Sequence, residues 1–214
     1  MILIAFSSIC AVLYGFKYTH NPISLTRTIV KTCATLGLCL AGLLLGAPWV
    51  VLVGLLFGAL GDAFLSRDHA VGFLPGLAAF LCGHLIYLFW GVAQTNLTAP
   101  TTLQIIASIL LLISGAFFVK RWWSALGALK LPVLLYAIIS MCLGVVALGM
   151  LGQGIGTLFA IGVLVFVLSD IILAEQLFML RADDAKYPLY ASLLWALYWA
   201  GQLGILLGSL SFVS

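Results

Sequence analysis

Apolar stretches long enough to cross a bilayer follow one another along almost the whole chain. A transmembrane α-helix needs about 20 apolar residues, and the helix satisfies its own backbone hydrogen bonds where water is absent. We expect spans over residues 1–16, 28–46, 48–65, 71–93, 101–119, 132–150, 155–180 and 187–212. The first span is short and the second connection is tight, so seven or nine helices are alternatives to eight.

The composition agrees with a membrane location. Of the 214 residues, 64% are hydrophobic and 7% are charged, whereas soluble domains carry about 25% charged residues. A net charge of +3 is too small and too dispersed to indicate a nucleic-acid partner. The sequence therefore predicts an all-α integral membrane protein surrounded by membrane lipids, with about eight transmembrane helices in a single membrane domain over residues 1–214.

The positive charges divide between alternate loops. All nine Lys and Arg residues fall around the first, third, fifth and seventh loops: Lys17, Arg27 and Lys31; Arg67; Lys120, Arg121 and Lys130; Arg181 and Lys186. Loops rich in Lys and Arg stay in the cytoplasm. The pattern therefore predicts that the odd-numbered loops are cytoplasmic and that both termini lie outside.

Two aspartates interrupt the apolar spans. Asp62 stands in "GALGDAFL" and Asp170 in "VFVLSDIILAEQLF", although a charged Asp near a helix centre costs about 2.5–3.5 kcal/mol. Asp62 precedes Arg67 by about 7–8 Å along a helix, and Asp170 precedes Arg181 by about 16 Å. Both therefore belong to the cytoplasmic half of the bundle, on different helices. One interpretation is that each only hydrogen-bonds a neighbouring helix.

Further polar side chains occur at a comparable depth in other spans. His84 and Tyr87 are three residues apart, Tyr136 and Ser140 are four apart, and Tyr198 and Gln202 are four apart, while Lys31 lies just inside the second span. Residues with these spacings share one helix face. Because cohesion alone does not need so many polar groups, we expect an internal polar cavity that opens toward the cytoplasm.

A metal site is not expected. His20 and His69 lie in loops and His84 lies deep in a span, so three imidazoles cannot converge on one zinc ion. The five cysteines all fall within apolar runs and show no CxxC spacing, which favours a role in packing.

Five short motifs resemble those of the lysoplasmalogenase family, the YhhN-like integral membrane proteins. They are "GDAFL" ending the third span, "GHLIY" in the fourth, Pro132 with Tyr136 and Met141 in the sixth, "LSDIILA" in the seventh and "YWAGQ" in the eighth. They occur in the family's order and extend the match from about Lys31 to Gln202.

The resemblance implies an enzyme that hydrolyses the vinyl-ether bond of a lysophospholipid, a lysoplasmalogen. The products would be a fatty aldehyde and glycerophosphoethanolamine or glycerophosphocholine. It also implies that Asp62 and Asp170 are the catalytic pair. We expect substrate-binding roles for Lys31, His84, Tyr87, Tyr136, Tyr198 and Gln202, no cofactor, and a bacterial inner membrane as the location.

Two carboxyl groups suit this chemistry independently of the family. A vinyl ether breaks when an acid protonates its β-carbon and water captures the resulting oxocarbenium ion, and glycosidases use two carboxyl groups for a similar cation. One carboxyl must be protonated, which low-dielectric surroundings favour, and the other must be anionic. The sequence leaves open which aspartate is the acid.

Three other functions are alternatives. Intramembrane carboxylates also mark ion pathways, which would fit a small-molecule or proton-coupled transporter, although no inverted repeat is evident. A non-catalytic lipid receptor could use the same cavity. A hydrolase of ester or amide lipids would fit the fold, although no GxSxG motif supports acyl chemistry.

The charge pattern generates a prediction about topology. We expect an alkaline phosphatase fused after residue 214 to be active, because this reporter folds only outside the cytoplasm and both termini are predicted there. The same reporter inserted in the loop 181–186 should be inactive. A C-terminal reporter that works only in the cytoplasm would contradict the predicted orientation.

Overall fold

The computed structural model describes residues 2–67, 69–95, 100–152, 154, 156–181 and 183–213, with the backbone alone at 69 and 70. These residues form eight α-helices and no β-strand: α1 (Ile2–Leu13), α2 (Leu25–Leu44), α3 (Trp49–Leu65), α4 (His69–Gln94), α5 (Thr102–Trp122), α6 (Lys130–Met150), α7 (Thr157–Met179) and α8 (Tyr187–Ser209). Short helical turns extend three of them: η1 (Tyr14–Tyr18) follows α1, η2 (Gly127–Leu129) precedes α6 and η3 (Leu210–Phe212) follows α8.

The helices have the length and composition of membrane spans. Within the described residues, six are long and apolar enough to cross a membrane, while Ile2–Tyr18 and Trp49–Leu65 are shorter apolar helices. The predicted all-α membrane bundle of about eight helices is confirmed.

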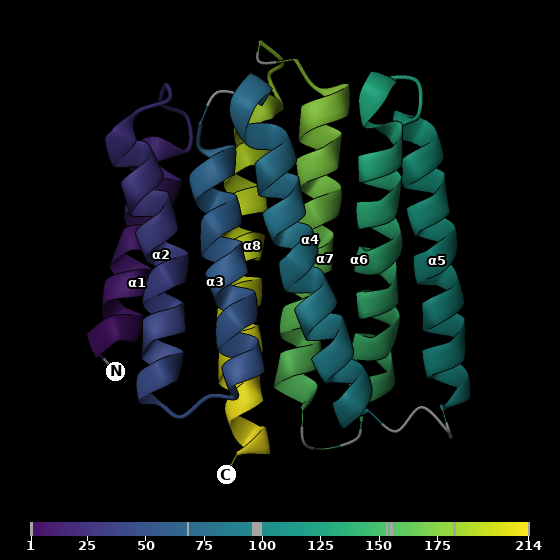
Figure 1. Ribbon diagram of the computed structural model, residues 1–214. Coiled ribbons are helices and arrows are strands. Elements are labelled where there is room, and N and C mark those ends of the chain that lie inside the picture. Colours follow the sequence, from purple (N-terminus) through teal and green to yellow (C-terminus); the bar gives the residue numbers. More distant parts are fainter. Residues whose placement is uncertain are drawn as a thin grey trace.

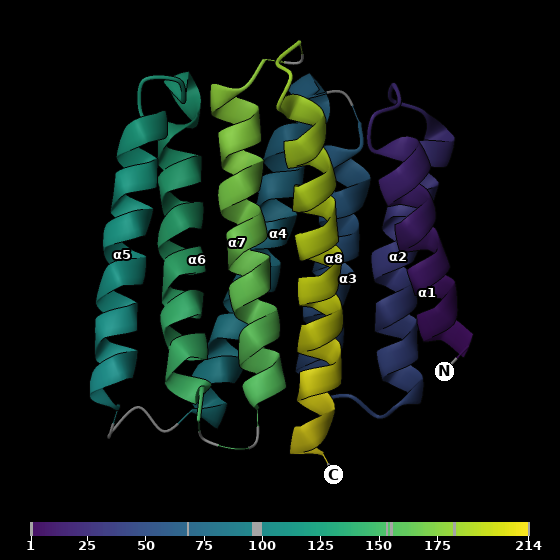
Figure 2. The same cartoon turned by 180° about the vertical axis from the view of Figure 1, so that it is seen from behind.

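The bundle has two layers. Helices α2, α3 and α4 form the layer seen in front in Figure 1, and α1, α8 and α7 form the layer seen in front in Figure 2. Helix α6 packs against both α4 and α7, and α5 packs on α6 at one edge. The front and back layers meet through α2 and α3 against α8, so a site between the layers is enclosed by helices on both sides.

Glycines bring α7 and α8 into close contact. A Cβ atom added at Gly162 would lie 2.4 Å from the backbone nitrogen of Ile205, and one added at Gly208 would lie 2.0 Å from that of Phe159. Only residues without a side chain allow two backbones to approach so closely, as is common where membrane helices pack. This contact fixes the position of α7, which carries Asp170, relative to α8, which carries Tyr198.

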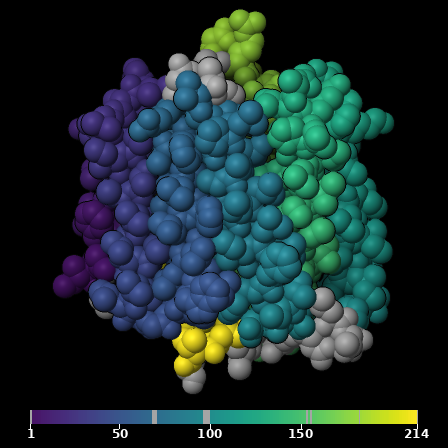
Figure 3. Space-filling model, viewed as in Figure 1, coloured from purple at the N-terminus to yellow at the C-terminus, as the bar shows by residue number. Residues whose placement is uncertain are grey.

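The outer surface of the bundle is apolar. On α5, the side chains of Leu110, Ile113 and Phe117 are each 61% exposed. Helices α2 and α3, which form part of the face shown in Figure 3, also expose large apolar side chains, such as Leu43 and Leu56. Such a surface fits contact with lipid chains rather than with water.

The chain ends and the basic loops lie at opposite ends of the bundle. Figure 1 shows the α1–α2, α5–α6 and α7–α8 connections at the upper end and both labelled termini at the lower end. Helix α2 begins at Leu25, three residues before the predicted start, because the Ser24 side chain accepts a hydrogen bond from the backbone N–H of Arg27 and caps the helix. Arg27 is therefore helical and shares a face with Lys31, one turn further along α2.

Candidate active site

Asp62 is fully buried on α3 and is surrounded by polar groups from α2 and α8. Its Oδ2 accepts hydrogen bonds from the Thr35 hydroxyl at 2.6 Å and from the Tyr198 hydroxyl at 2.8 Å. Its Oδ1 forms an ion pair with the Lys31 Nζ at 3.2 Å and accepts no hydrogen bond from the described residues. A buried carboxylate requires such partners, and Lys31 provides the compensating positive charge.

The approach of these groups depends on spacing along α2 and on a small residue of α3. Lys31 and Thr35 are four residues apart and therefore share a face. A Cβ atom at Gly58 would lie 3.0 Å from the Gln202 Nε2 and 3.2 Å from the Tyr198 hydroxyl. The glycine therefore leaves the space in which the α8 side chains reach across to α3.

Asp170 on α7 has a different set of partners. Its Oδ1 accepts a hydrogen bond from the Tyr136 hydroxyl at 2.8 Å, and its Oδ2 accepts one from the Ser140 hydroxyl at 3.1 Å. The same Oδ2 lies 2.9 Å from the His84 Nε2. The imidazole is fully buried, whereas the Asp170 side chain is 11% exposed. Asp170 is thus the member of this cluster that reaches open space.

The His84 ring fixes one proton at this cluster. Its Nδ1 lies 2.9 Å from the Phe80 carbonyl oxygen, and a carbonyl only accepts, so Nδ1 carries a hydrogen. A second proton must then lie between Nε2 and the Asp170 Oδ2, either on the imidazole or on the carboxyl group. In both cases the His84–Asp170 pair holds a proton that can be transferred. The Asp62–Lys31 pair instead consists of a carboxylate and an ammonium group.

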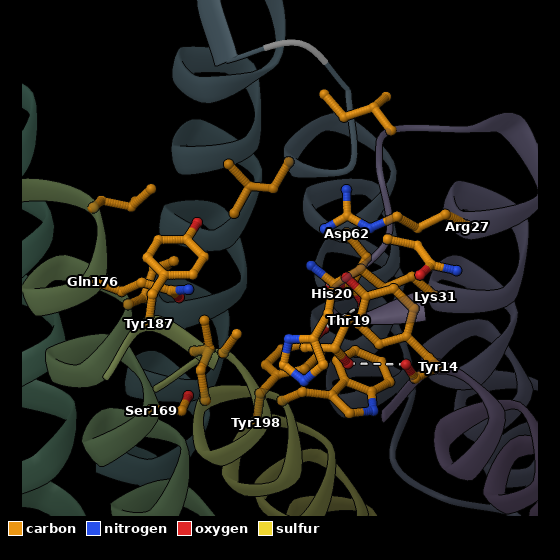
Figure 4. A pocket seen from close by; sticks show the side chains of 18 of the residues that line it. Tyr14, Thr19, His20, Arg27, Lys31, Asp62, Ser169, Gln176, Tyr187 and Tyr198 are labelled. Atoms are coloured by element: carbon orange, nitrogen blue, oxygen red, sulfur yellow. Dashed lines mark hydrogen bonds and ion pairs between the residues drawn. The ribbon is translucent and has the colours of Figure 1, made fainter. Parts of the chain in front are cut away.

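Both aspartates line one cavity of about 530 Å³, with walls from α2, α3, α4, α7, α8 and the η1–α2 connection. Figure 4 shows Arg27, Lys31 and Tyr14 on one side of this cavity and Gln176 and Tyr187 on the other. The cavity opens at the end of the bundle that carries the basic loops, since His20 and Arg67 also line it. The expected internal polar cavity is therefore present.

Aromatic rings separate the two carboxyl groups. The Phe80 and Phe166 rings each pack edge-on against the Tyr198 ring, at centroid distances of 5.6 and 5.7 Å. Phe166 also lies against His84, with ring centroids 4.6 Å apart. Each carboxyl group thus keeps its own donors, and the cavity wall between them is apolar enough to hold a hydrocarbon part of a ligand.

The structure divides the sequence-predicted binding residues into three groups. Lys31 and Tyr198 line the cavity beside Asp62. His84 and Tyr136 lie behind Asp170 and bind its carboxyl group. Tyr87 and Gln202 are buried and pair with each other, the Tyr87 hydroxyl donating to the Gln202 Oε1 at 3.0 Å, and neither lines the cavity.

Sequence reasoning missed Thr35 and treated Arg27 and Arg67 only as markers of topology. Arg27, Lys31 and Thr35 recur every four residues, which would have placed all three on one face of α2. That spacing was the available signal.

A third carboxyl group within the helices has a different role. Glu175 on α7 accepts hydrogen bonds from the Arg121 Nη2 at 2.8 Å and from the Trp122 Nε1 at 2.7 Å. Both partners belong to the end of α5, and Glu175 does not line the cavity. It fastens α5 to α7 and is a suitable control for the two aspartates.

The fold and the site define a class of protein. It is a helical membrane protein with one internal cavity that two aspartates line, and each aspartate has a partner of its own, Lys31 or His84. The chain belongs to the YhhN family, whose sequence model matches residues 26–209. This range contains both aspartates and all six predicted binding residues, and the resemblance carried by the five sequence motifs is confirmed.

One curated relative is the human (Homo sapiens) lysoplasmalogenase TMEM86B. It is 29% identical over 209 residues, which cover 94% of this chain and 83% of the human protein. No solved structure matches the chain.

Proposed function

We propose that this protein hydrolyses the vinyl-ether bond of lysoplasmalogens with Asp62 and Asp170 as its catalytic groups. Membership of the YhhN family and the similarity to a human lysoplasmalogenase support the reaction class. The observation that carries the mechanism is that two aspartates line one cavity, one beside an imidazole and the other beside an ammonium group. The products would be a fatty aldehyde and a glycerophosphodiester.

The first step is protonation of carbon. The proton held by the His84–Asp170 pair moves from the Asp170 carboxyl group to the β-carbon of the vinyl ether, and the π electrons of the double bond form the new C–H bond. The α-carbon and the ether oxygen then share the positive charge of an oxocarbenium ion. Asp170 takes this role because it reaches the cavity, whereas His84 is fully buried and acts by positioning it.

The second step is addition of water. The Asp62 carboxylate stabilises the cation and removes a proton from the water that bonds to the α-carbon, which gives a hemiacetal. Its Oδ1 lies 3.2 Å from the Lys31 Nζ, and a carboxylate oxygen can accept more than one hydrogen bond. The two carboxyl groups thus divide the acid and base roles, as in glycosidases.

Collapse of the hemiacetal restores both groups. The protonated Asp62 donates to the glycerol oxygen as its bond to the α-carbon breaks, and the hemiacetal hydroxyl returns its proton to Asp170. The aldehyde and the glycerophosphodiester then leave with every atom accounted for. No step requires a metal ion or an organic cofactor.

We also propose that the basic end of the bundle faces the cytoplasm of a bacterial cell, with the protein in the inner membrane. The positive-inside rule supports this orientation. The cavity would then receive its substrate from the cytoplasmic side of the bilayer.

The substrate itself provides the first test. Detergent-purified protein should release aldehyde from a 1-alkenyl lysophospholipid and leave the saturated 1-alkyl analogue and the 1-acyl lysophospholipid intact, because only the vinyl ether accepts a proton on carbon. Mass spectrometry of the products measures this selectivity, and a chelator should leave the rate unchanged. Binding of all three lipids without turnover would instead support a lipid receptor. Chelator-sensitive activity restored by zinc would contradict the two-carboxyl mechanism.

The aspartates provide the second test. Asp62→Asn and Asp170→Asn should each lower kcat by about 10²–10⁴, the range that a general acid or base contributes, because an amide keeps the shape of the carboxyl group and cannot exchange its proton. The double variant should be little slower than either single variant, since groups that act together are not additive.

Glu175→Gln is the matched control, because it removes a helix carboxyl group that lies outside the cavity. It should stay within a few-fold of the wild-type rate. Size-exclusion chromatography and thermal unfolding should show that the Asn variants remain folded. Full activity in a well-folded Asp62→Asn variant, or poor folding with normal specific activity in both variants, would contradict a catalytic role.

A further inference from the structure

The mouth of the cavity carries more positive charge than its aspartates compensate. Three Lys and Arg side chains line it, Arg27, Lys31 and Arg67, against the two carboxyl groups of Asp62 and Asp170. Lys31 is paired with Asp62. In the part of the chain that the structure describes, neither arginine has a carboxylate partner. Two guanidinium groups therefore face the cavity without a carboxylate partner among the described residues.

Arg27 is held with its ends available to a ligand. Its Nε donates to the Tyr18 carbonyl oxygen at 3.1 Å, and the guanidinium carbon lies 5.8 Å from the centroid of the Tyr14 ring. These contacts orient the planar group, while its Nη atoms have no partner among the described residues. Guanidinium groups with free N–H donors on one edge recognise phosphate oxygens in particular.

Arg27 near the start of α2 and Arg67 just after α3 lie nearer the mouth of the cavity than Asp62 does. Arg27 precedes Lys31 by four residues, hence by about 6 Å along α2. Arg67 lies two residues beyond the end of α3 at Leu65, and α3 ends at the end of the bundle where α2 begins. His20, which is exposed at the same mouth, adds a polar ring hydrogen-bonded to the Ser192 hydroxyl at 3.2 Å.

We infer that Arg27 and Arg67 form a binding site for the headgroup phosphate of a lysophospholipid, an inference that rests on the proposed function. One glycerol unit links the phosphate to the vinyl ether in such a lipid. A phosphate held at the mouth therefore places the vinyl ether one step deeper, near Lys31 and the aspartates. The site recognises the phosphodiester and not the ethanolamine or choline beyond it.

The other wall of the cavity fits the rest of the amphiphile. Leu173 and Leu177 line the cavity from α7, the helix whose Gln176 lies on the other side of the cavity from Arg27 and Lys31 in Figure 4. A lipid whose phosphate contacts Arg27 thus has an apolar surface for its hydrocarbon chain. In this arrangement the phosphate lies on the α2 side of the cavity and the hydrocarbon chain lies against α7.

The test compares two vinyl-ether substrates, a 1-alkenyl lysophospholipid and the 1-alkenyl glycerol that lacks the phosphate. Arg27→Gln and Arg67→Gln should each raise KM for the phospholipid about tenfold, and the double variant about 100-fold, with kcat little changed, because each removes charge-assisted hydrogen bonds to the phosphate. For the uncharged alkenyl glycerol the variants should match the wild type. Arg181→Gln is the control. Arg181 lies at the same end of the bundle, does not line the cavity, and among the described residues forms an ion pair only with the exposed Asp183.

A binding measurement separates failure of this site from failure of the proposed reaction. Thermal unfolding with the uncleavable 1-alkyl lysophospholipid should show stabilisation of the wild type and of Arg181→Gln, and a much smaller shift for the Arg27→Gln, Arg67→Gln double variant. Inorganic phosphate at the same concentration should give no shift, because it lacks the chain that the apolar wall binds. Equal losses of the double variant on both vinyl-ether substrates, or equal binding of the alkyl lipid, would overturn the phosphate site. If the wild-type protein releases no aldehyde, the proposed reaction is wrong. The binding measurement with the alkyl lipid still tests the phosphate site in that case.

Discussion

A carboxyl group buried among membrane helices loses most of its hydration, so the protein must supply donors and compensating charge for it. This constraint determines the centre of the bundle. Asp62 on α3 binds Lys31 and Thr35 of α2 and Tyr198 of α8. Asp170 on α7 binds side chains of α4 and α6 in the same way. The two clusters therefore connect six of the helices and close a cavity between the layers.

The same partners that compensate the aspartates also make them chemically different. A lysine leaves its carboxylate anionic in an ion pair, whereas a histidine whose Nδ1 is bound to a carbonyl shares a proton with its carboxyl group. Acid and base roles in one site usually arise when the environments of two titratable groups differ. In this protein the difference follows from which helix supplies the neighbour. The stability of the bundle and the proposed reaction consequently depend on the same hydrogen bonds.

The sequence predicted the membrane class, the helices and the two aspartates, because hydropathy and the cost of an intramembrane charge act locally along the chain. It could not predict partners that lie on other helices. Tyr87 and Gln202 were expected to bind the substrate, and the structure shows a hydrogen bond between them that their depth in two different helices did not predict. Glu175 lies six residues before Arg181 in the sequence and yet pairs with Arg121, which is 54 residues away. The sequence also left open which aspartate is the acid, and our proposal that it is Asp170 rests on the His84–Asp170 contact between two helices.

We propose that the protein delivers a proton to the β-carbon of the vinyl ether before water adds. The most direct measurement is hydrolysis of a 1-alkenyl lysophospholipid in water that carries both deuterium and ¹⁸O. Mass spectrometry of both products follows at early times. Protonation on carbon predicts one deuterium on the carbon next to the aldehyde group and no ¹⁸O in the glycerophosphodiester. Aldehyde without deuterium would contradict protonation on carbon, and ¹⁸O in the glycerol hydroxyl would mean that the bond between glycerol carbon and oxygen is broken.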